Sequence, residues 1–398
     1  MSPRTALRRL LLGLLLAAAA ASPGVRAVEV ELTAQYRGAS GHTFEHTTPP
    51  STACAFFPST CRSRPSVTVP ITYTKETAVV SNIRANFFLA TPAPRTGRIY
   101  HEQTGEGHEI ELSFQTASQQ VASPTRSRNP ASGRYKLNGS NCQIQTGAWR
   151  SALEYVTRWN LAAGTGACAS RPDSSTVGQR ETVEASALSL FYTLKLPSVF
   201  RLTPGRYRGS ITYSVGAGSD FDFGDNVQAL SDHEMTFAIV VDVEHSFRVQ
   251  FAANTDLVTL EPPGGWVAWL DGGRIPPKLS AEVPLRLWSS GPFRIYKFCE
   301  YDVGANCGIR NRRGEDVPVQ LAVTLPRYLT DFQGWQSINR RPIPTGRAAA
   351  LRVEAQIFTA NGPGQVHFEV AQTDLRPMLD RAGERYNGQV TVVFDAEL

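Results

Sequence analysis

The chain has 398 residues, of which 41% are hydrophobic and 19% are charged, and its formal net charge is +5. This length predicts two or three domains. Four arginines fall within the first 26 residues, so the remaining chain is close to neutral and its bulk charge gives no case for nucleic-acid binding.

Residues 1–27 have the pattern of a secretory signal peptide. Arg4, Arg8 and Arg9 form a positive start, and the apolar run Leu10–Ala21 is too short to span a bilayer. Small residues then offer cleavage after Ala27 or after Ala21. A retained N-terminal anchor is the alternative, which the short and Ala-rich run disfavours. We therefore expect the mature chain to be exported and soluble.

All six cysteines follow this segment. An even number of cysteines in an exported chain predicts disulfides. Short loops favour pairing between nearest neighbours, although six cysteines allow many other connectivities. A zinc site is the weaker alternative because the sequence has no Cys-x-x-Cys pair. The predicted pairs are Cys54–Cys61, Cys142–Cys168 and Cys299–Cys307.

Along the chain, apolar residues recur at every second position, with Gly and Pro clusters between the runs, and helical periodicity is almost absent. This pattern is typical of short antiparallel strands. It predicts an all-β fold with two immunoglobulin-like sandwich domains in tandem. Ser151–Trp159 is left open between a short helix and another strand. The alternating runs are residues 28–32, 67–73, 110–114, 188–196, 237–243 and 317–325.

A polar stretch at Ala229–Glu234 suggests the domain boundary. We place the N-terminal domain at 28–232 and the C-terminal domain at 233–398. The motif Tyr-x-Gly-x-(Ile/Val)-Thr occurs twice, starting at Tyr207 and at Tyr386, which favours two modules that each close with a similar late strand. Chance recurrence of so short a motif is the alternative.

Catalytic motifs are missing from the sequence: it has no nucleophile elbow, no Walker loop and no dinucleotide fingerprint. We therefore predict no enzyme activity, no cofactor and no metal site. His42 and His46 lie in a loop-like segment, where a surface pair is favoured over a metal site. Asp220, Asp222 and Asp225 lack the spacing of an EF-hand, so a solvated turn is favoured over a calcium site.

The segment Pro124–Lys136 is rich in arginine and contains no acidic residue. Its Ser, Pro, Asn and Gly content predicts a loop. Guanidinium groups can bind a carboxylate or sulfate bidentately, and a tyrosine offers a flat face to a sugar ring, so an acidic glycan is one candidate ligand. A solubilising loop is an equal alternative. The candidate receptor-binding residues are Arg126, Arg128, Arg134, Tyr135 and Lys136, which Arg62, Arg64, Arg95 and Arg98 would join only if the fold brings them close.

The last residues of the sequence form an alternating apolar strand. We expect this strand to be a sheet edge that another polypeptide completes, because an unpaired edge leaves a row of backbone groups without partners. The alternative is an ordinary last strand, paired on both sides within its own domain. The residues on its apolar face are Val390, Val392, Phe394, Ala396 and Leu398.

A secreted all-β chain that ends in Tyr386-x-Gly388-x-Val390-x-Val392-x-Phe394 resembles the bacterial chaperone–usher fimbrial proteins. Its two domains are similar to the tip adhesins, or pilus biogenesis initiators, of the alternate-chaperone (CS1/CFA/I-like) class. The resemblance implies a C-terminal pilin domain that lacks its final strand. A periplasmic chaperone lends this strand and the next subunit later replaces it, a form of β-strand addition.

The resemblance further implies that Val390, Val392, Phe394 and Ala396 line a donor-strand groove and that the Leu398 carboxylate meets basic residues of the chaperone. The expected partners are this chaperone, an outer-membrane usher, a major pilin subunit and a host glycan or glycoprotein receptor. The expected location is the fimbrium tip at the cell surface, reached through the periplasm. Two alternatives stay open: a structural initiator of assembly that binds no receptor, and a secreted lectin or hydrolase of sandwich fold.

Overall fold

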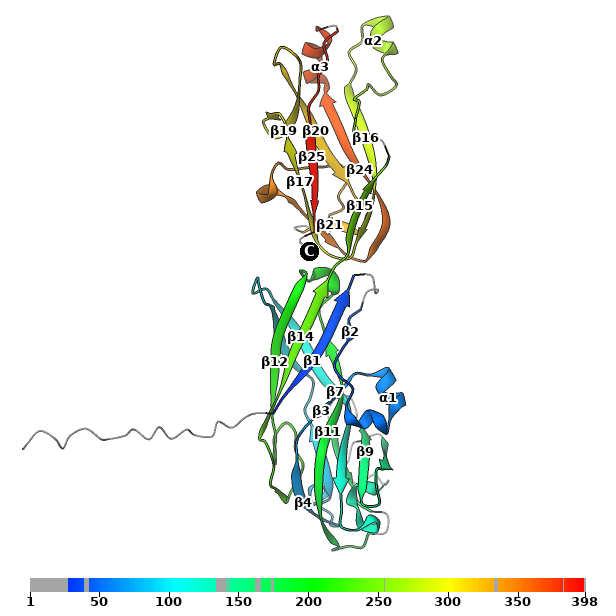
Figure 1. Ribbon diagram of the computed structural model, residues 1–398, viewed down its shortest axis with the longest axis vertical. Helices are drawn as coiled ribbons and strands as arrows, with labels where there is room; N and C mark the ends of the chain where they lie inside the picture. The colour runs from blue at the N-terminus through cyan, green and yellow to red at the C-terminus, as the bar shows by residue number, and fades with distance from the viewer. Residues whose placement is uncertain are drawn as a thin grey trace, which may run out of the picture.

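The protein is described by a computed structural model that covers residues 28–38, 43–133, 142, 144–161, 166–172, 175–253, 255–332, 336–381 and 383–396. Two elongated β-rich bodies are stacked end to end (Figure 1). The prediction of a two-domain all-β fold is confirmed. The described part of the chain has no helix with the length and apolar character needed to cross a membrane.

In the first body, twelve described strands form one curled sheet, and β10 and β5 form a second, two-stranded sheet. The main path runs β13-β4-β11-β7-β6-β12-β14-β1-β2, with β3 on β11 and with β8 and β9 beside β7. The strands are β1 (Val28–Arg37), β2 (Glu45–His46), β3 (Ser66–Val69), β4 (Tyr73–Ala78), β5 (Phe87–Thr91), β6 (Arg95–His101), β7 (Gly107–Ala122), β8 (Ile144–Trp149), β9 (Glu154–Asn160), β10 (Gly166–Ser170), β11 (Arg180–Lys195), β12 (Gly205–Ser214), β13 (Val227–Gln228) and β14 (Glu234–Glu244).

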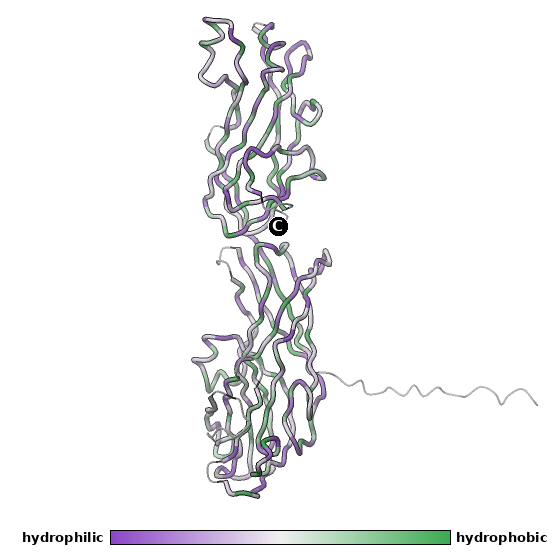
Figure 2. The backbone as a smooth tube through the Cα atoms, turned by 180° about the vertical axis from the view of Figure 1, so that it is seen from behind, coloured by the Kyte–Doolittle hydropathy of each residue, from purple (hydrophilic) through white to green (hydrophobic). Residues whose placement is uncertain are grey.

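The alternation in the sequence explains why these segments form half-buried strands. Figure 2 shows hydrophobic and hydrophilic residues alternating along the strands of both bodies. The clearest case is β14, which lies between β12 and β1 and turns every second side chain into the core. The buried side chains of β14 on this face are Met235, Phe237, Ile239, Val241 and Val243.

The second body contains two sheets. One follows the order β15-β16-β24-β20-β19-β18 with β22 on β20, and the other follows β21-β23-β17-β25. Its core includes Leu287, Ile295, Val323 and Val370, all almost fully buried. The strands are β15 (Phe247–Phe251), β16 (Lys278–Ser289), β17 (Phe293–Cys299), β18 (Asp302–Val303), β19 (Asn306–Arg310), β20 (Asp316–Thr324), β21 (Leu329–Asp331), β22 (Arg341–Pro342), β23 (Leu351–Ala355), β24 (Thr359–Ala371) and β25 (Val390–Asp395).

The predicted boundary between the two domains is wrong by one strand. Glu234–Glu244, which the sequence places at the start of the second domain, forms β14 and pairs with both β1 and β12 of the first sheet. The chain passes to the second body at His245 and Ser246, just before β15. In the sequence β14 and β15 look like one continuous strand, because the apolar alternation carries on across the short break between Glu244 and Phe247.

In the segment Ser151–Trp159, left open between helix and strand, residues 154–159 belong to strand β9 and residues 151–153 form a bend before it. The described helices α1 (Pro58–Ser63), α2 (Val267–Gly272) and α3 (Gln372–Leu379) are short. The structure also confirms the nearest-neighbour disulfides, Cys54–Cys61, Cys142–Cys168 and Cys299–Cys307.

Candidate functional site: two open sheet edges and a basic cavity

Strand β25 lies at the edge of its sheet and pairs with β17 on one side only (Figure 1). The two strands are antiparallel, with Ile295 opposite Phe394 and Cys299 opposite Val390. No described strand pairs with the other side of β25. The alternative of a last strand that is paired on both sides within its own domain therefore does not hold for the described chain.

The hydrogen bonds fix which residues of β25 face the open side. The Glu300 amide donates to the Gln389 carbonyl over 2.9 Å, whereas the Lys297 amide donates away from β25, to the Pro344 carbonyl over 2.9 Å. In an antiparallel pair, successive residues turn their backbone groups alternately toward and away from the partner strand. Thr391, Val393 and Asp395 therefore face β17. The residues whose backbone N–H and C=O groups face the open edge are Val390, Val392 and Phe394.

Strand β15 is the open edge of the other sheet and has the same arrangement. Its pairing with β16 is flanked by a bond from the Ser290 amide to the Ser246 carbonyl over 3.1 Å, and by one from the Ala252 amide to the Pro284 carbonyl over 3.2 Å. The same alternation then turns one set of backbone groups away from β16. That set belongs to Phe247, Val249 and Phe251.

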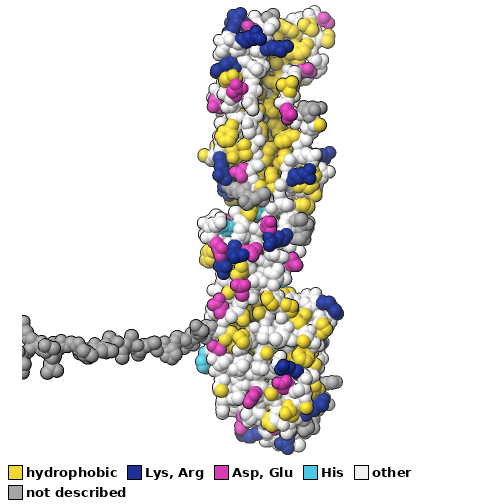
Figure 3. Space-filling view, in the orientation of Figure 1, with side chains coloured by type: hydrophobic (Ala, Val, Ile, Leu, Met, Phe, Trp, Pro, Cys, Tyr) yellow, Lys and Arg dark blue, Asp and Glu magenta, His cyan; other side chains and the backbone are white. Residues whose placement is uncertain are grey.

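The side chains of these two sets lie on the inner faces of their sheets, yet they are not fully covered. Leu287, which pairs with Val249, and Ile295, which pairs with Phe394, are completely buried. In contrast, Phe251 is 40% exposed, and Val249 and Phe394 are half-buried. The space-filling view shows hydrophobic side chains gathered in a stripe along the second body (Figure 3).

The two edges approach each other at one point. The rings of Phe251 and Phe394 meet edge to face, with centroids 6.1 Å apart. We call the open edges of β15 and β25, together with their inner apolar side chains, the acceptor seam. The contact between the two rings covers part of this seam.

The first body shows what a completed seam looks like. There β14 lies between β12 and β1, antiparallel to β12 and parallel to β1. The repeated Tyr-x-Gly motif aligns β12 with the approach to β25. In both places the glycine allows close contact, since a Cβ on Gly209 would lie 2.1 Å from the Arg98 carbonyl oxygen and one on Gly388 would lie 2.5 Å from that of Gly308. The position that β14 fills in the first body has no described counterpart in the second.

The predicted groove residues therefore lie at one open edge. Val390, Val392 and Phe394 share the inner face of β25, and half-buried Ala396 follows the end of the strand. Leu398 lies outside the described residues. The sequence did not indicate that β15 would form the opposite edge, because its alternating pattern resembles that of a strand paired on both sides.

The predicted basic loop is only partly described. Arg126 lies in a 3-10 turn and stacks on Trp149 at 4.5 Å, and exposed Arg128 borders a cavity of only about 10 Å³, roughly the space of one water. Arg134, Tyr135 and Lys136 lie outside the described residues.

The acidic turn after β12 is neutralised by arginines of the first body. Asp222 accepts a bond of 2.5 Å from Arg84, which also pairs with Asp225 at 3.0 Å, and Asp220 pairs with Arg95 at 2.6 Å. Burial raises the pKa of Asp222, but the bonds with Arg84 and with backbone amides lower this pKa by more than burial raises it. The pKa of Asp222 therefore lies below its usual value. The turn is thus ion-paired, not simply solvated, and the described residues contain no cluster of metal-binding side chains.

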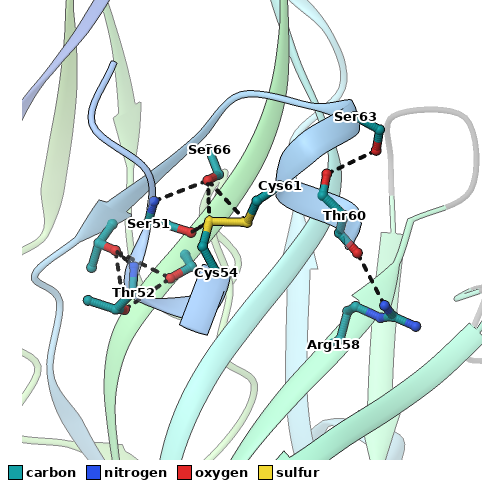
Figure 4. Close-up of a disulfide and its surroundings, with 10 residues drawn as sticks. Ser51, Thr52, Cys54, Thr60, Cys61, Ser63, Ser66 and Arg158 are labelled. Atoms are coloured by element: carbon teal, nitrogen blue, oxygen red, sulfur yellow. Dashed lines mark hydrogen bonds between the residues drawn. A yellow bond between two sulfur atoms is a disulfide. The ribbon is translucent and has the colours of Figure 1, made fainter. Parts of the chain in front are cut away.

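A second cavity, of about 290 Å³, lies beside the Cys54–Cys61 disulfide. Figure 4 shows this disulfide joining Cys54, in the 3-10 turn Thr52–Ala55, to Cys61 of α1. The Ser66 hydroxyl lies against its sulfur atoms. The sequence did not predict this cavity, since its walls come from separate segments. Its lining is His46, Thr48, Pro50, Cys61, Arg62, Ser63, Arg64, Pro65 and Ser66.

Neither a protein-family model nor a curated protein matches the sequence. Solved structures do align with it. A mutant of the adhesin CfaE of enterotoxigenic E. coli shares 8% identity over 92% of this chain and 92% of its own, with a TM-score of 0.26. A chain from a chaperone–tip adhesin complex of CFA/I fimbriae biogenesis shares 8% identity over 93% and 95%, with a TM-score of 0.26.

A third alignment is with a chain of the CsuC–CsuE chaperone–tip adhesion subunit complex from the archaic chaperone–usher Csu pili of Acinetobacter baumannii. It has 10% identity over 93% of this chain and 98% of that chain, with a TM-score of 0.21. Each of these three alignments covers more than nine-tenths of this chain.

Proposed function

We propose that this protein is a minor fimbrial subunit at a pilus tip, which mediates adhesion through its first domain and is anchored by a strand that another polypeptide inserts into its second domain. The acceptor seam carries this proposal. It offers two rows of outward-facing backbone groups and an apolar floor between them, which an inserted strand would pair and cover together.

The first body provides a template for the inserted strand. By analogy with β14, a donor would run antiparallel to β25 and parallel to β15. It would carry about five apolar residues at alternate positions, as β14 does. Burial of five such side chains contributes roughly 7–15 kcal/mol before entropy costs, which is comparable with the stability of a whole domain.

The partners follow from this role. A periplasmic chaperone would fill the seam during export, an outer-membrane usher would receive the complex, and a major pilin subunit would supply the donor strand in the fibre. The strand β1 is paired with β14 along its whole length, so it is not free to serve as a donor to another subunit. A subunit that accepts a strand and whose β1 is paired within its own sheet suits the tip, at the cell surface.

The test is co-expression of the full chain with a periplasmic pilus chaperone, which the proposal expects to be encoded beside it. We expect a one-to-one complex that is lost when Val392 and Phe394 are replaced by Asp. Thr391→Asp is the matched control because Thr391 is exposed and its backbone pairs with β17. Retention of the complex in the Val392 and Phe394 variants, or its loss in the control alone, would contradict the proposal.

A cell-binding assay separates adhesion from a purely structural role at the tip. The full chain should bind host cells and compete with intact fimbriae for them. If the chaperone complex forms but the protein binds no cell or glycan, it is an assembly initiator without a receptor.

A further inference from the structure

The cavity beside the Cys54–Cys61 disulfide is a distinct feature of the first body. It is an open hollow at the surface, and its volume of about 290 Å³ is a size suited to one sugar unit. The wall on one side is α1 and the segment after it, and on the other side it is β2 and the residues that follow. The disulfide ties α1 to the preceding turn, which fixes this wall.

The charge of this cavity is one-sided. Arg62 and Arg64 border it and are both exposed, and neither has an ion-pair partner among the described residues. By contrast, Arg84 and Arg95 of the same domain are paired with aspartates. No Asp or Glu occurs in the described lining. Two guanidinium groups without a carboxylate partner favour an anion.

The remaining lining suits a sugar that carries this anion. Ser63 is exposed and carries a hydroxyl group, and the rings of Pro50 and Pro65 offer small apolar faces. His46 also lines the cavity.

We infer that this cavity binds the carboxylate or sulfate group of an acidic sugar, with Arg62 and Arg64 as the anion-binding pair. The inference rests on the proposed role in adhesion and names the class of ligand and its site. It places the receptor contact at the disulfide-tied wall. The described arginines of the loop after β7, Arg126 and Arg128, do not border this cavity.

The experiment measures binding of the full-length chain to three immobilised sugars: lactose with a terminal sialic acid, lactose with a sulfate ester, and unmodified lactose. We expect binding to one or both acidic sugars and none to lactose. The acidic sugar that binds distinguishes carboxylate from sulfate as the source of the anion. Binding should weaken with rising salt because the contacts are between charges at an exposed site.

Variants then locate the site. Arg62→Gln and Arg64→Gln should each weaken binding by about tenfold, which corresponds to the loss of one charge-assisted contact. Arg208→Gln is the matched control: it removes one exposed arginine of the same domain that does not border the cavity. The expected control result is unchanged affinity, with unchanged thermal unfolding in all three variants.

Three results would overturn the inference: unchanged binding in both cavity variants, loss of binding only in Arg126→Gln or Arg128→Gln, or no binding to either acidic sugar. None of these would affect the chaperone complex, which tests the second domain separately. Loss of that complex with retained acidic-sugar binding would instead contradict the strand-acceptor proposal and leave this site standing.

Discussion

Fusion of a donor strand to the C-terminus should stabilise the second domain. The end of β25 lies beside the junction of the two bodies (Figure 1), so a short flexible linker lets a following strand turn back and run antiparallel to β25. The donor carries five apolar residues at alternate positions, in the pattern of β14. Its backbone can then pair with the open groups of Val390, Val392 and Phe394.

The expected gain in stability depends on the apolar surface that the donor strand would bury. Its own five apolar side chains contribute roughly 7–15 kcal/mol on burial. The half-buried side chains of the acceptor seam, Phe251 and Phe394 among them, would lose their remaining exposure as well. Ordering of the donor backbone offsets much of this gain. We expect a net increase of about 5 kcal/mol, which raises the midpoint of thermal unfolding by roughly 10–20 °C for a domain of this size.

Differential scanning calorimetry of the fused chain measures this change in the transition of the second domain. The control is the same peptide with its pattern shifted by one residue, which turns its apolar side chains toward solvent. The reasoning is refuted if the fusion leaves the transition unchanged. It is equally refuted if the shifted peptide stabilises the domain as much as the matched one.

Two predictions concern the first domain and the junction. Lys75 is fully buried, and its ammonium donates to the carbonyl oxygens of Arg84, Phe223 and Asp225 at 2.9, 2.6 and 2.8 Å. Lys75→Met leaves these carbonyl groups without a donor, so it should lower the free energy of unfolding of the first domain by about 3 kcal/mol in urea titration. The exposed Lys195→Met control should change it by less than about 0.5 kcal/mol, and equal effects would contradict the assigned role of Lys75. At the junction, burial lowers the pKa of His245, whose Nε2 donates to the Leu202 carbonyl over 2.7 Å. Because the unfolded chain then binds the proton more readily, stability should fall as the pH drops below the ordinary histidine pKa of about 6.5, and His245→Gln should reduce this dependence; urea titrations across this pH range that show the same slope in both proteins would contradict it.

The apolar alternation of Val390, Val392 and Phe394 was sufficient to predict a strand and the face of that strand that turns inward. It could not identify β15 as the opposite edge. A strand with one unpaired side has the same side-chain pattern as a strand with two partners, because pairing is a property of the backbone. For the same reason the sequence assigned Glu234–Glu244 to the wrong domain.

The disulfide between Cys54 and Cys61 could be predicted from sequence, whereas the cavity beside it could not. Short spacing predicted that Cys54 pairs with Cys61, since nearby cysteines meet without distant contacts. The cavity beside this pair forms where β2 and the residues after it lie against α1 and the residues after it, an arrangement that residue spacing does not indicate. Arg62 and Arg64 were therefore noticed as basic residues, but their common site became visible only in three dimensions.

Residue-resolved amide hydrogen exchange of β25 tests most directly whether the second domain is an incomplete sandwich. In the full chain without a donor, the amides of Val390, Val392 and Phe394 should exchange rapidly, while those of Thr391, Val393 and Asp395 are protected by their bonds to β17. Addition of the chaperone or of a donor peptide should protect the first three. Equal protection of all six amides in the donor-free chain would show that β25 is already paired on both sides, and the account of a strand acceptor would fail.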